Sequence, residues 1–352
     1  MKFSNKEIGN NTPVFIVLEA GPTHYSLESA LALVDVAADS GADAIKFQIG
    51  SAKKLIPDPT VMFTYTYLKN KATGETEEVT ESLQEILLRR ELSEEEWKNI
   101  AKHCKEKNIT FFATVFDVDN LPLLWELGVE CVKICSADIN YHYLLREAAK
   151  YDWIVQIDTG GATIAEVEQA IFVLEEAKCN KIIINHCPSG YPAHLESINL
   201  NVLTTLKQMF DYPIAFSDHN PGSTMDIAAT ALGVNMLEKT ITLDRTIKSP
   251  EHIMSLEPDE VKSFVQTIRE VEIALGKKRR FMSQTEKEKS KIGRRSIYAG
   301  EDIKKGAELT QKMFHYARPE KGVPAHLDYL LLGRTANRDI KKGELILLES
   351  IQ

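Results

Sequence analysis

Polar and ionisable residues stand at the ends of the apolar, β-branched runs in this sequence. One run, which includes Pro213 and Ile214, ends in Ser217, Asp218 and His219. A histidine next to an aspartate can serve as a general base or as a metal ligand. Other runs end in the same way, and their terminal polar residues are Glu19, Lys46, Gln48, Thr114, Lys133, Ser136, Asp138, Asp158, Thr159, His186, Ser189, Tyr191, Glu238, Lys239 and Thr240. A single group of this kind is usually only solvated, but the recurrence indicates one shared site.

Two lysines lie inside apolar runs rather than beside them. Lys46 stands in "AIKFQ" (44–48) and Lys133 in "CVKIC" (131–135). A buried ammonium group is costly unless it is paired or bound to an anion. Together with the hydroxyls of Ser136, Ser189 and Ser217, the two lysines predict a site for a phosphate, a carboxylate or both.

The apolar runs alternate with segments of helical periodicity. Two of these segments start with capping-box patterns, Ser93 with Glu96 and Thr163 with Glu166. The strand-like runs are 14–19, 44–48, 110–115, 131–135, 153–158, 181–187, 212–218 and 235–242. Eight strands alternating with helices predict an α/β fold, a (β/α)8 TIM barrel, in which catalytic residues lie at the carboxyl ends of the strands. An open doubly wound sheet is the alternative, but no G-x-G-x-x-G pattern follows the first run.

The sequence predicts two domains. Residues 1–278 form the barrel, and the highly charged segment 279–293 is a linker. Residues 294–352 form a small β-rich domain, because "SIYAGEDIKKGAELT" and "TANRDIKKGELILLE" are related, each with a turn after Asp-Ile-Lys-Lys-Gly. The polar segment 51–82 is too long for a plain connection, and it is either a cover for the active site or a passive surface excursion.

Composition limits the class of protein. The 352 residues carry a net charge of −9, which disfavours nucleic-acid binding but does not exclude small anionic substrates. The chain starts without the apolar region of a signal peptide, and no apolar run approaches the ~20 residues that a membrane span needs. The five cysteines show no C-x-x-C spacing, which indicates a reducing cytoplasm.

Taken together, the motifs resemble those of the sialic acid synthase family over nearly the whole chain. They are "LEAGPTHYSLE", "GADAIKFQ", "LSEEEWKNI", "VKICSADI", "DTGGAT", "HCPSGYPA", "FSDHN", "EKTITLDRTIKSPEHIMSLEP" and "GRRSIYAGEDIKKGAELT…RPEKGVP". The resemblance implies a TIM barrel followed by an antifreeze-like SAF domain. It also implies an enzyme that condenses phosphoenolpyruvate with an N-acylated amino-sugar aldehyde and releases phosphate.

The resemblance assigns roles to individual residues. The expected catalytic residues are Glu19, Lys46, Lys133, Asp218 and Glu251. The residues expected to bind substrate are Gln48, Thr114, Ser136, Asp138, Asp158, Ser189, Tyr191, Ser217 and Arg318. His219 is the expected ligand of a divalent metal, usually manganese. Arg318 is expected to reach the active site of a second copy, which implies a domain-swapped homodimer.

Two positions depart from the family pattern. The second metal histidine of the family falls at Thr240, and threonine is a poor ligand for manganese or zinc. Glu251 and His252 are nearby in sequence and could help to hold the metal. Asp158 replaces a serine at the donor phosphate, and a carboxylate there repels phosphate unless it binds a cation or is neutralised by Lys133.

These departures leave three hypotheses. The first is a synthase with an altered metal site. The second is a variant aldolase or lyase that uses a different 2-keto acid donor. The third is a non-catalytic relative that binds a sugar or a partner. The two buried lysines favour an active enzyme.

Overall fold

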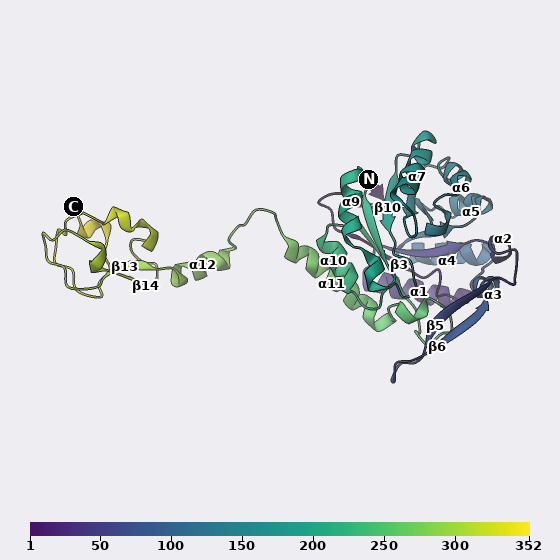
Figure 1. Cartoon of the computed structure of the whole chain (residues 1–352), viewed down its shortest axis with the longest axis horizontal. Coiled ribbons are helices and arrows are strands. Elements are labelled where there is room, and N and C mark those ends of the chain that lie inside the picture. Colours follow the sequence, from purple (N-terminus) through teal and green to yellow (C-terminus); the bar gives the residue numbers. More distant parts are fainter. The chain divides into compact units, whose positions relative to one another are not determined.

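The structure is a computed structural model that describes all 352 residues. It divides into two compact units, Met1–Gly276 and Lys277–Gln352 (Figure 1). The first unit holds the eight expected strands, and the second contains the segment expected to be a linker. No helix is both long and apolar enough to cross a membrane.

The first unit is built on a closed barrel of parallel strands, as the sequence predicted. The barrel strands are β3 (Phe15–Glu19), β4 (Ala44–Ile49), β7 (Thr110–Val115), β8 (Cys131–Ile134), β9 (Ile154–Asp158), β10 (Ile182–His186), β11 (Ile214–Asp218) and β12 (Met236–Thr240). Neighbours along the chain pair in order, and β12 pairs with β3 to close the barrel.

Helices surround the barrel and begin where the sequence supplies caps. Ser26, Ser93 and Thr163 each form a capping box, the last two as predicted. The helices of this unit are α1 (Leu27–Ser40), α2 (Ala52–Leu55), α3 (Leu83–Leu88), α4 (Glu94–Glu106), α5 (Leu121–Glu126), α6 (His142–Ala148), α7 (Ile164–Glu176), α8 (Leu195–Ile198), α9 (Asn201–Met209), α10 (Thr224–Ala231) and α11 (Pro258–Leu275). Short 3-10 turns lie at Val118–Asn120, Ser136–Asp138 and His252–Met254.

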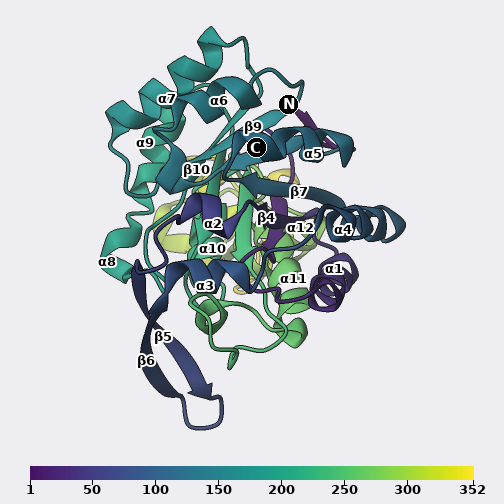
Figure 2. The ribbon, with the colours of Figure 1, turned by 90° about the vertical axis from the view of Figure 1, so that its right-hand side faces the viewer.

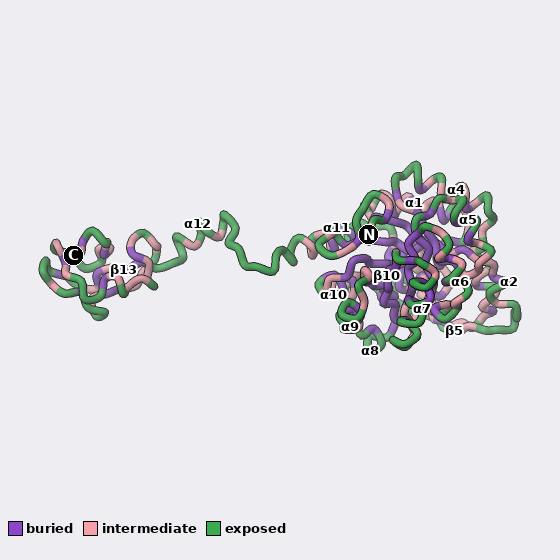
Figure 3. The backbone as a smooth tube through the Cα atoms, turned by 90° about the horizontal axis from the view of Figure 1, so that it is seen from above, coloured by how far each residue is buried: buried purple, intermediate pink, exposed green.

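Side chains alternate between two apolar cores along each barrel strand. In β3, Ile16 and Leu18 join the core between the barrel and its helices, whereas Phe15 and Val17 join the core inside the barrel. The buried residues accordingly concentrate in the barrel (Figure 3). The N-terminal hairpin consists of β1 (Lys2–Phe3) and β2 (Lys6–Glu7). It covers the amino end of the barrel interior, where Phe3 stacks on Phe15 with 4.8 Å between the ring centroids.

Segment 51–82 is a hairpin rather than an irregular loop. Its strands β5 (Met62–Asn70) and β6 (Glu75–Ser82) pair antiparallel and extend beyond the barrel helices (Figure 2). Lys71 near the tip contacts Asp244 at 3.0 Å. Most residues of the hairpin are exposed or half-buried, and β5 packs against the turn His252–Met254 of the segment after β12, so both alternatives for this segment stay open.

The second unit combines a helix with a small, irregular β domain. The charged segment expected to be a linker contains α12 (Gln284–Gly293), which starts with a capping box at Ser283. Only β13 (Ser296–Ala299) and β14 (Phe314–Ala317) are regular strands, and the remaining pairings are isolated bridges and 3-10 turns at Gln311–Met313, Ala325–Leu330 and Leu348–Ser350. The domain is thus less regular than the sequence suggested.

The two related Asp-Ile-Lys-Lys-Gly segments face each other in this unit. Ile303 and Ile340 exchange both backbone hydrogen bonds, each at 2.8 Å. Asp302 accepts from the backbone N–H of Lys342 at 2.9 Å, and Asp339 accepts from that of Lys305 at 2.8 Å. The internal repeat therefore forms a nearly symmetric pair. Gly306 and Gly343 end the two segments with φ of 86° and 83°, which an L side chain rarely adopts.

Candidate active site

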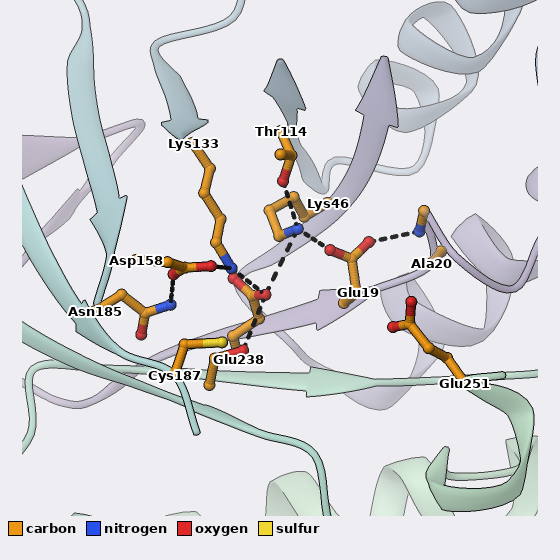
Figure 4. Close-up of polar contacts among 12 residues, drawn as sticks. Glu19, Ala20, Lys46, Thr114, Lys133, Asp158, Asn185, Cys187, Glu238 and Glu251 are labelled. Atoms are coloured by element: carbon orange, nitrogen blue, oxygen red, sulfur yellow. Dashed lines mark hydrogen bonds and ion pairs between the residues drawn. The ribbon is translucent and has the colours of Figure 1, made fainter. Parts of the chain in front are cut away.

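A cluster of ionisable side chains fills the carboxyl end of the barrel interior (Figure 4). Alternate side chains of a strand point to the same face, so Glu19 points inward like Phe15 and Val17. For the same reason Lys46 of β4 and Lys133 of β8 point into the barrel. The cluster consists of Glu19, Lys46, Thr114, Lys133, Asp158, Ser217 and Glu238, each at most 4% exposed. The sequence placed all seven residues at strand ends and assigned a role to every one except Glu238.

Glu238 is the residue that the sequence reasoning left without a role, and it joins the two lysines. Its Oε1 accepts from Lys133 Nζ at 2.6 Å and from Ser217 Oγ at 3.2 Å, and it lies 3.5 Å from Lys46 Nζ. Its Oε2 is buried and has no hydrogen-bond partner. Met236 faces the barrel interior, and Glu238 follows it by two residues on the same strand. This spacing was the feature of the sequence that could have placed Glu238 in the site.

The two lysines sit in different electrostatic surroundings. Lys46 contacts Glu19 and donates to Thr114 Oγ1 at 3.0 Å. Burial nevertheless outweighs the attraction of nearby carboxylates, of which Glu238 is the strongest, and lowers the pKa of Lys46 to about 8. Burial also opposes the charge of Lys133, but Asp158 and Glu238 raise its pKa above the usual range.

Asp158 is paired with Lys133, one of the outcomes that the sequence allowed. Its Oδ2 lies 2.9 Å from Lys133 Nζ, and its Oδ1 accepts from Asn185 Nδ2 at 2.5 Å. Burial raises the pKa of Asp158, and Lys133 opposes that effect. By contrast, Lys133 and Lys46 overcome the effect of burial and lower the pKa of Glu238 to about 2.

Asp218 does not join this cluster, contrary to the catalytic role predicted for it. It follows the inward Ser217, so its side chain points to the opposite face of β11. There Asp218 Oδ2 accepts from Lys239 Nζ at 2.5 Å, and Asp226 of α10 lies 3.3 Å from the same ammonium group. Asp218 also accepts from the backbone N–H of Asn220 at 3.0 Å. It therefore ties β11, β12 and α10 together behind the site.

His219 lies at the mouth of the barrel, but its surroundings do not form a metal site. Its Nδ1 is 3.1 Å from the carbonyl oxygen of Pro188, and its Nε2 is 3.9 Å from Cys187 Sγ. Thr240 occupies the next register position on β12, and His252 instead contacts Thr242 at 2.7 Å. No three His, Cys, Asp or Glu side chains are grouped to hold a metal. The residues present therefore do not fit a metal held by the protein alone.

Glu251 and Tyr191 border the cluster. Glu251 Oε1 lies 3.8 Å from Arg90 Nη1, and Figure 4 draws Glu251 without a contact to the other labelled residues. The Tyr191 ring packs 4.8 Å from the His219 ring, centroid to centroid. The negative charge of Glu251, followed by burial, raises the pKa of Tyr191, so its hydroxyl stays protonated.

The other predicted residues occupy the rim or lie elsewhere. Gln48 follows Lys46 on the inward face of β4. Ser136 Oγ accepts from the backbone N–H of Gly160 at 3.1 Å, and Asp138 accepts from Cys135 Sγ at 3.2 Å. Ser189 is exposed and lines a cavity of about 350 Å³ between the loops after β9 and β10 and helices α7 and α9. Arg318 belongs to the second unit, directly after β14.

Comparison with known proteins agrees with this architecture. The NeuB family model matches residues 33–280, and the SAF domain model matches residues 294–352. The chain belongs to the NeuB family. It is 35% identical to N,N'-diacetyllegionaminic acid synthase of Campylobacter jejuni over 94% of this chain and 98% of that protein. It is 29% identical to human N-acetylneuraminate-9-phosphate synthase over 98% of this chain and 94% of that protein.

A solved structure of a family member has the same fold. It is an N-acetylneuraminic acid synthetase from Leptospira borgpetersenii in complex with citrate, with 33% identity and a TM-score of 0.71. The match covers 82% of this chain and 94% of that one. The suspected family, the TIM barrel and the SAF domain are thereby confirmed.

Proposed function

We propose that this NeuB-family protein is a nonulosonic acid synthase that condenses phosphoenolpyruvate with an N-acylated amino-sugar aldehyde. The observation that carries the proposal is the pair of buried lysines, Lys46 and Lys133, at the carboxyl end of the barrel. Family members with whole-chain similarity are named as synthases of legionaminic, pseudaminic and N-acetylneuraminic acids. Those names support the reaction class and leave the sugar acceptor open.

The lysines supply the positive charge that the donor needs. Phosphoenolpyruvate carries a carboxylate and a phosphate, and charge-assisted hydrogen bonds to ammonium groups are strong in a dry site. Thr114 and Ser217 place hydroxyls beside Lys46 and Glu238 respectively, where they can orient the donor. Both lysines also contact carboxylates, so the donor must compete with Glu19 for Lys46 and with Asp158 and Glu238 for Lys133.

The reaction balances without a redox partner. Carbon 3 of the donor forms a bond to the aldehyde carbon, and the aldehyde oxygen becomes a hydroxyl. One water molecule adds to carbon 2 of the donor, and the bond between carbon 2 and the phosphate oxygen breaks. Inorganic phosphate leaves with one of the water protons, and the other goes to the aldehyde oxygen. Glu238 Oε2 can accept a hydrogen bond from that water, because it is buried and has no other partner. With a pKa of about 2, Glu238 orients the water rather than removing its proton.

The assembly and the compartment belong to the same proposal. A homodimer in which Arg318 of one copy completes the barrel mouth of the other follows from the family resemblance. A reducing compartment, the cytoplasm, fits the five free thiols. The divalent metal that the resemblance implies does not fit the residues around His219, and none of the steps above depends on one.

The test is phosphate release from phosphoenolpyruvate with a panel of N-acylated amino-sugar aldehydes. The proposal expects sugar-dependent release with at least one acceptor. A Lys133→Met variant that is confirmed as folded serves as the control and should release none. Consumption of pyruvate instead of phosphoenolpyruvate would favour the aldolase alternative. Sugar binding without turnover of either donor would indicate the non-catalytic alternative.

A further inference from the structure

The site has an excess of negative charge before any substrate binds. Three carboxylates, Glu19, Asp158 and Glu238, face only two ammonium groups, so with all five groups ionised the cluster sums to 2 − 3 = −1. All five side chains are at most 5% exposed. Both lysines are already paired, Lys133 with Asp158 at 2.9 Å and with Glu238 at 2.6 Å. Neither lysine is a free cation that awaits an anion.

The proposed donor worsens this imbalance. Phosphoenolpyruvate carries three negative charges above the second pKa of its phosphate, which is about 6. Its entry would bring the cluster from −1 to −4. Like charges repel more strongly in a buried site than in water, because the effective dielectric there is lower. A site with this charge therefore needs a compensating proton.

We propose that Asp158 takes up one proton from solvent when phosphoenolpyruvate binds, which frees Lys133 to hold the donor. This inference rests on the proposed function and adds a specificity-determining role for Asp158. Asp158 is a better candidate for the proton than Glu238, because it has fewer positively charged partners. Asp158 has one lysine and the neutral amide of Asn185 as partners, whereas Glu238 has two lysines and Ser217.

The barrel interior can also accommodate the added proton. Asn185 Oδ1 and both amide atoms of Gln156 are buried without hydrogen-bond partners. Gln156 precedes Asp158 on the inward face of β9, and Asn185 pairs with Asp158 in the β9–β10 register. A neutral carboxyl at Asp158 can donate to an unpartnered acceptor of this kind, which an ionised carboxylate cannot do.

Lys46, with a pKa of about 8, is the one neighbouring group that can compete for this proton, and it is mostly charged already at pH 7. The charged or titratable groups around Asp158 are Lys46, Lys133, Cys135, His186, Cys187, Tyr191, His219 and Glu238. Burial raises the pKa of both thiols and lowers the pKa of both histidines, so all four stay neutral. Tyr191 is already protonated, and Glu238 is held ionised by the lysines.

The sign of the pH dependence follows from linkage. Bound donor stabilises protonated Asp158, so its pKa is higher in the complex than in the free protein. Affinity is then greatest below the pKa of the free protein. It falls by up to about tenfold per pH unit as the pH rises towards the pKa of the complex, and it becomes constant above that.

The experiment is calorimetric titration of phosphoenolpyruvate into the full-length protein at pH 7, where Lys46 is mostly charged, without sugar and in buffers of different ionisation enthalpy. The slope of heat against that enthalpy counts the protons taken up. We expect about one proton for the native protein and close to none for Asp158→Asn. Asp158→Ser gives the same test if the first variant fails to fold.

A matched control uses a buried carboxyl outside the site. Burial raises the pKa of Asp226 well above its usual value, and this residue faces Lys239 rather than the barrel interior. Asp226→Asn should therefore keep the native proton count. Binding without proton uptake, or uptake that persists in Asp158→Asn, would overturn this inference and leave the proposed function standing. Absence of phosphoenolpyruvate binding in the native protein would overturn both.

Discussion

Glu238 Oε1 lies 2.6 Å from Lys133 Nζ and 3.5 Å from Lys46 Nζ, so one carboxylate is shared by the only two ammonium groups in the cluster. This relationship makes Glu238 the centre of the charge network. It also holds the two lysines at a distance set by strands β4, β8 and β12, which the barrel keeps rigid.

The first prediction concerns Glu238 itself. Glu238→Gln keeps the side-chain volume but removes the charge that both lysines share. We expect kcat to fall by roughly 10²–10³, the loss typical of removing one preorganised electrostatic group. Steady-state kinetics with thermal unfolding would check this. A folded variant with native kcat would show that Glu238 is only structural.

The second prediction concerns pH. Lys46 must be protonated to hold the donor, and its pKa is about 8. Its contribution is complete only well below pH 8 and is lost as the pH rises through that value. The kcat/KM for the donor should therefore fall about tenfold per pH unit on the alkaline side. In a folded Lys46→Arg variant the alkaline fall should move upward, because arginine stays charged. If the alkaline decrease in kcat/KM stays at the same pH in this variant, a group other than Lys46 causes it.

The third prediction separates Ser217 from Asp218, which are adjacent in sequence but lie on opposite faces of β11. Ser217→Ala should raise the donor KM and leave thermal stability nearly unchanged. Asp218→Asn should lower stability by about 1–3 kcal/mol, because buried Lys239 loses its charged partner. Chemical denaturation and donor kinetics on both variants would check this. If Asp218→Asn instead raises the donor KM and leaves stability unchanged, Asp218 belongs to the site.

The fourth prediction concerns metal. One histidine without a second ligand should not retain a divalent ion through dialysis, so the purified protein should contain far less than one manganese per chain. Thr240→His places a second imidazole at the register position beside His219 and should increase manganese retention. Elemental analysis of both proteins checks this. Stoichiometric metal in the native protein would contradict it.

The barrel was predictable because its signal is local. Each strand is a short apolar run between capped helices, and residues such as Ser93 and Thr163 mark where helices begin. The inward lysines were predictable for the same reason, since Lys46 and Lys133 interrupt buried runs. The charged segment that contains α12 was not predicted as a helix, because it lacks the apolar periodicity that identifies one.

The partners of these lysines were not predictable from local sequence. Asp158, Lys133 and Glu238 meet only because the barrel closes and brings β9, β8 and β12 around one interior. Asp218 was misassigned because a carboxylate beside a histidine indicates chemistry. Its side chain nevertheless follows the alternation of the strand and faces Lys239 on the outside.

The most direct test of the central claim is phosphorus and proton NMR of the native protein with phosphoenolpyruvate and each amino-sugar aldehyde. We expect one inorganic phosphate and one nine-carbon 2-keto sugar acid for each phosphoenolpyruvate consumed, with one acceptor preferred. If phosphoenolpyruvate stays intact with every acceptor while the protein is folded, the assignment of the buried lysine site as a synthase centre is wrong.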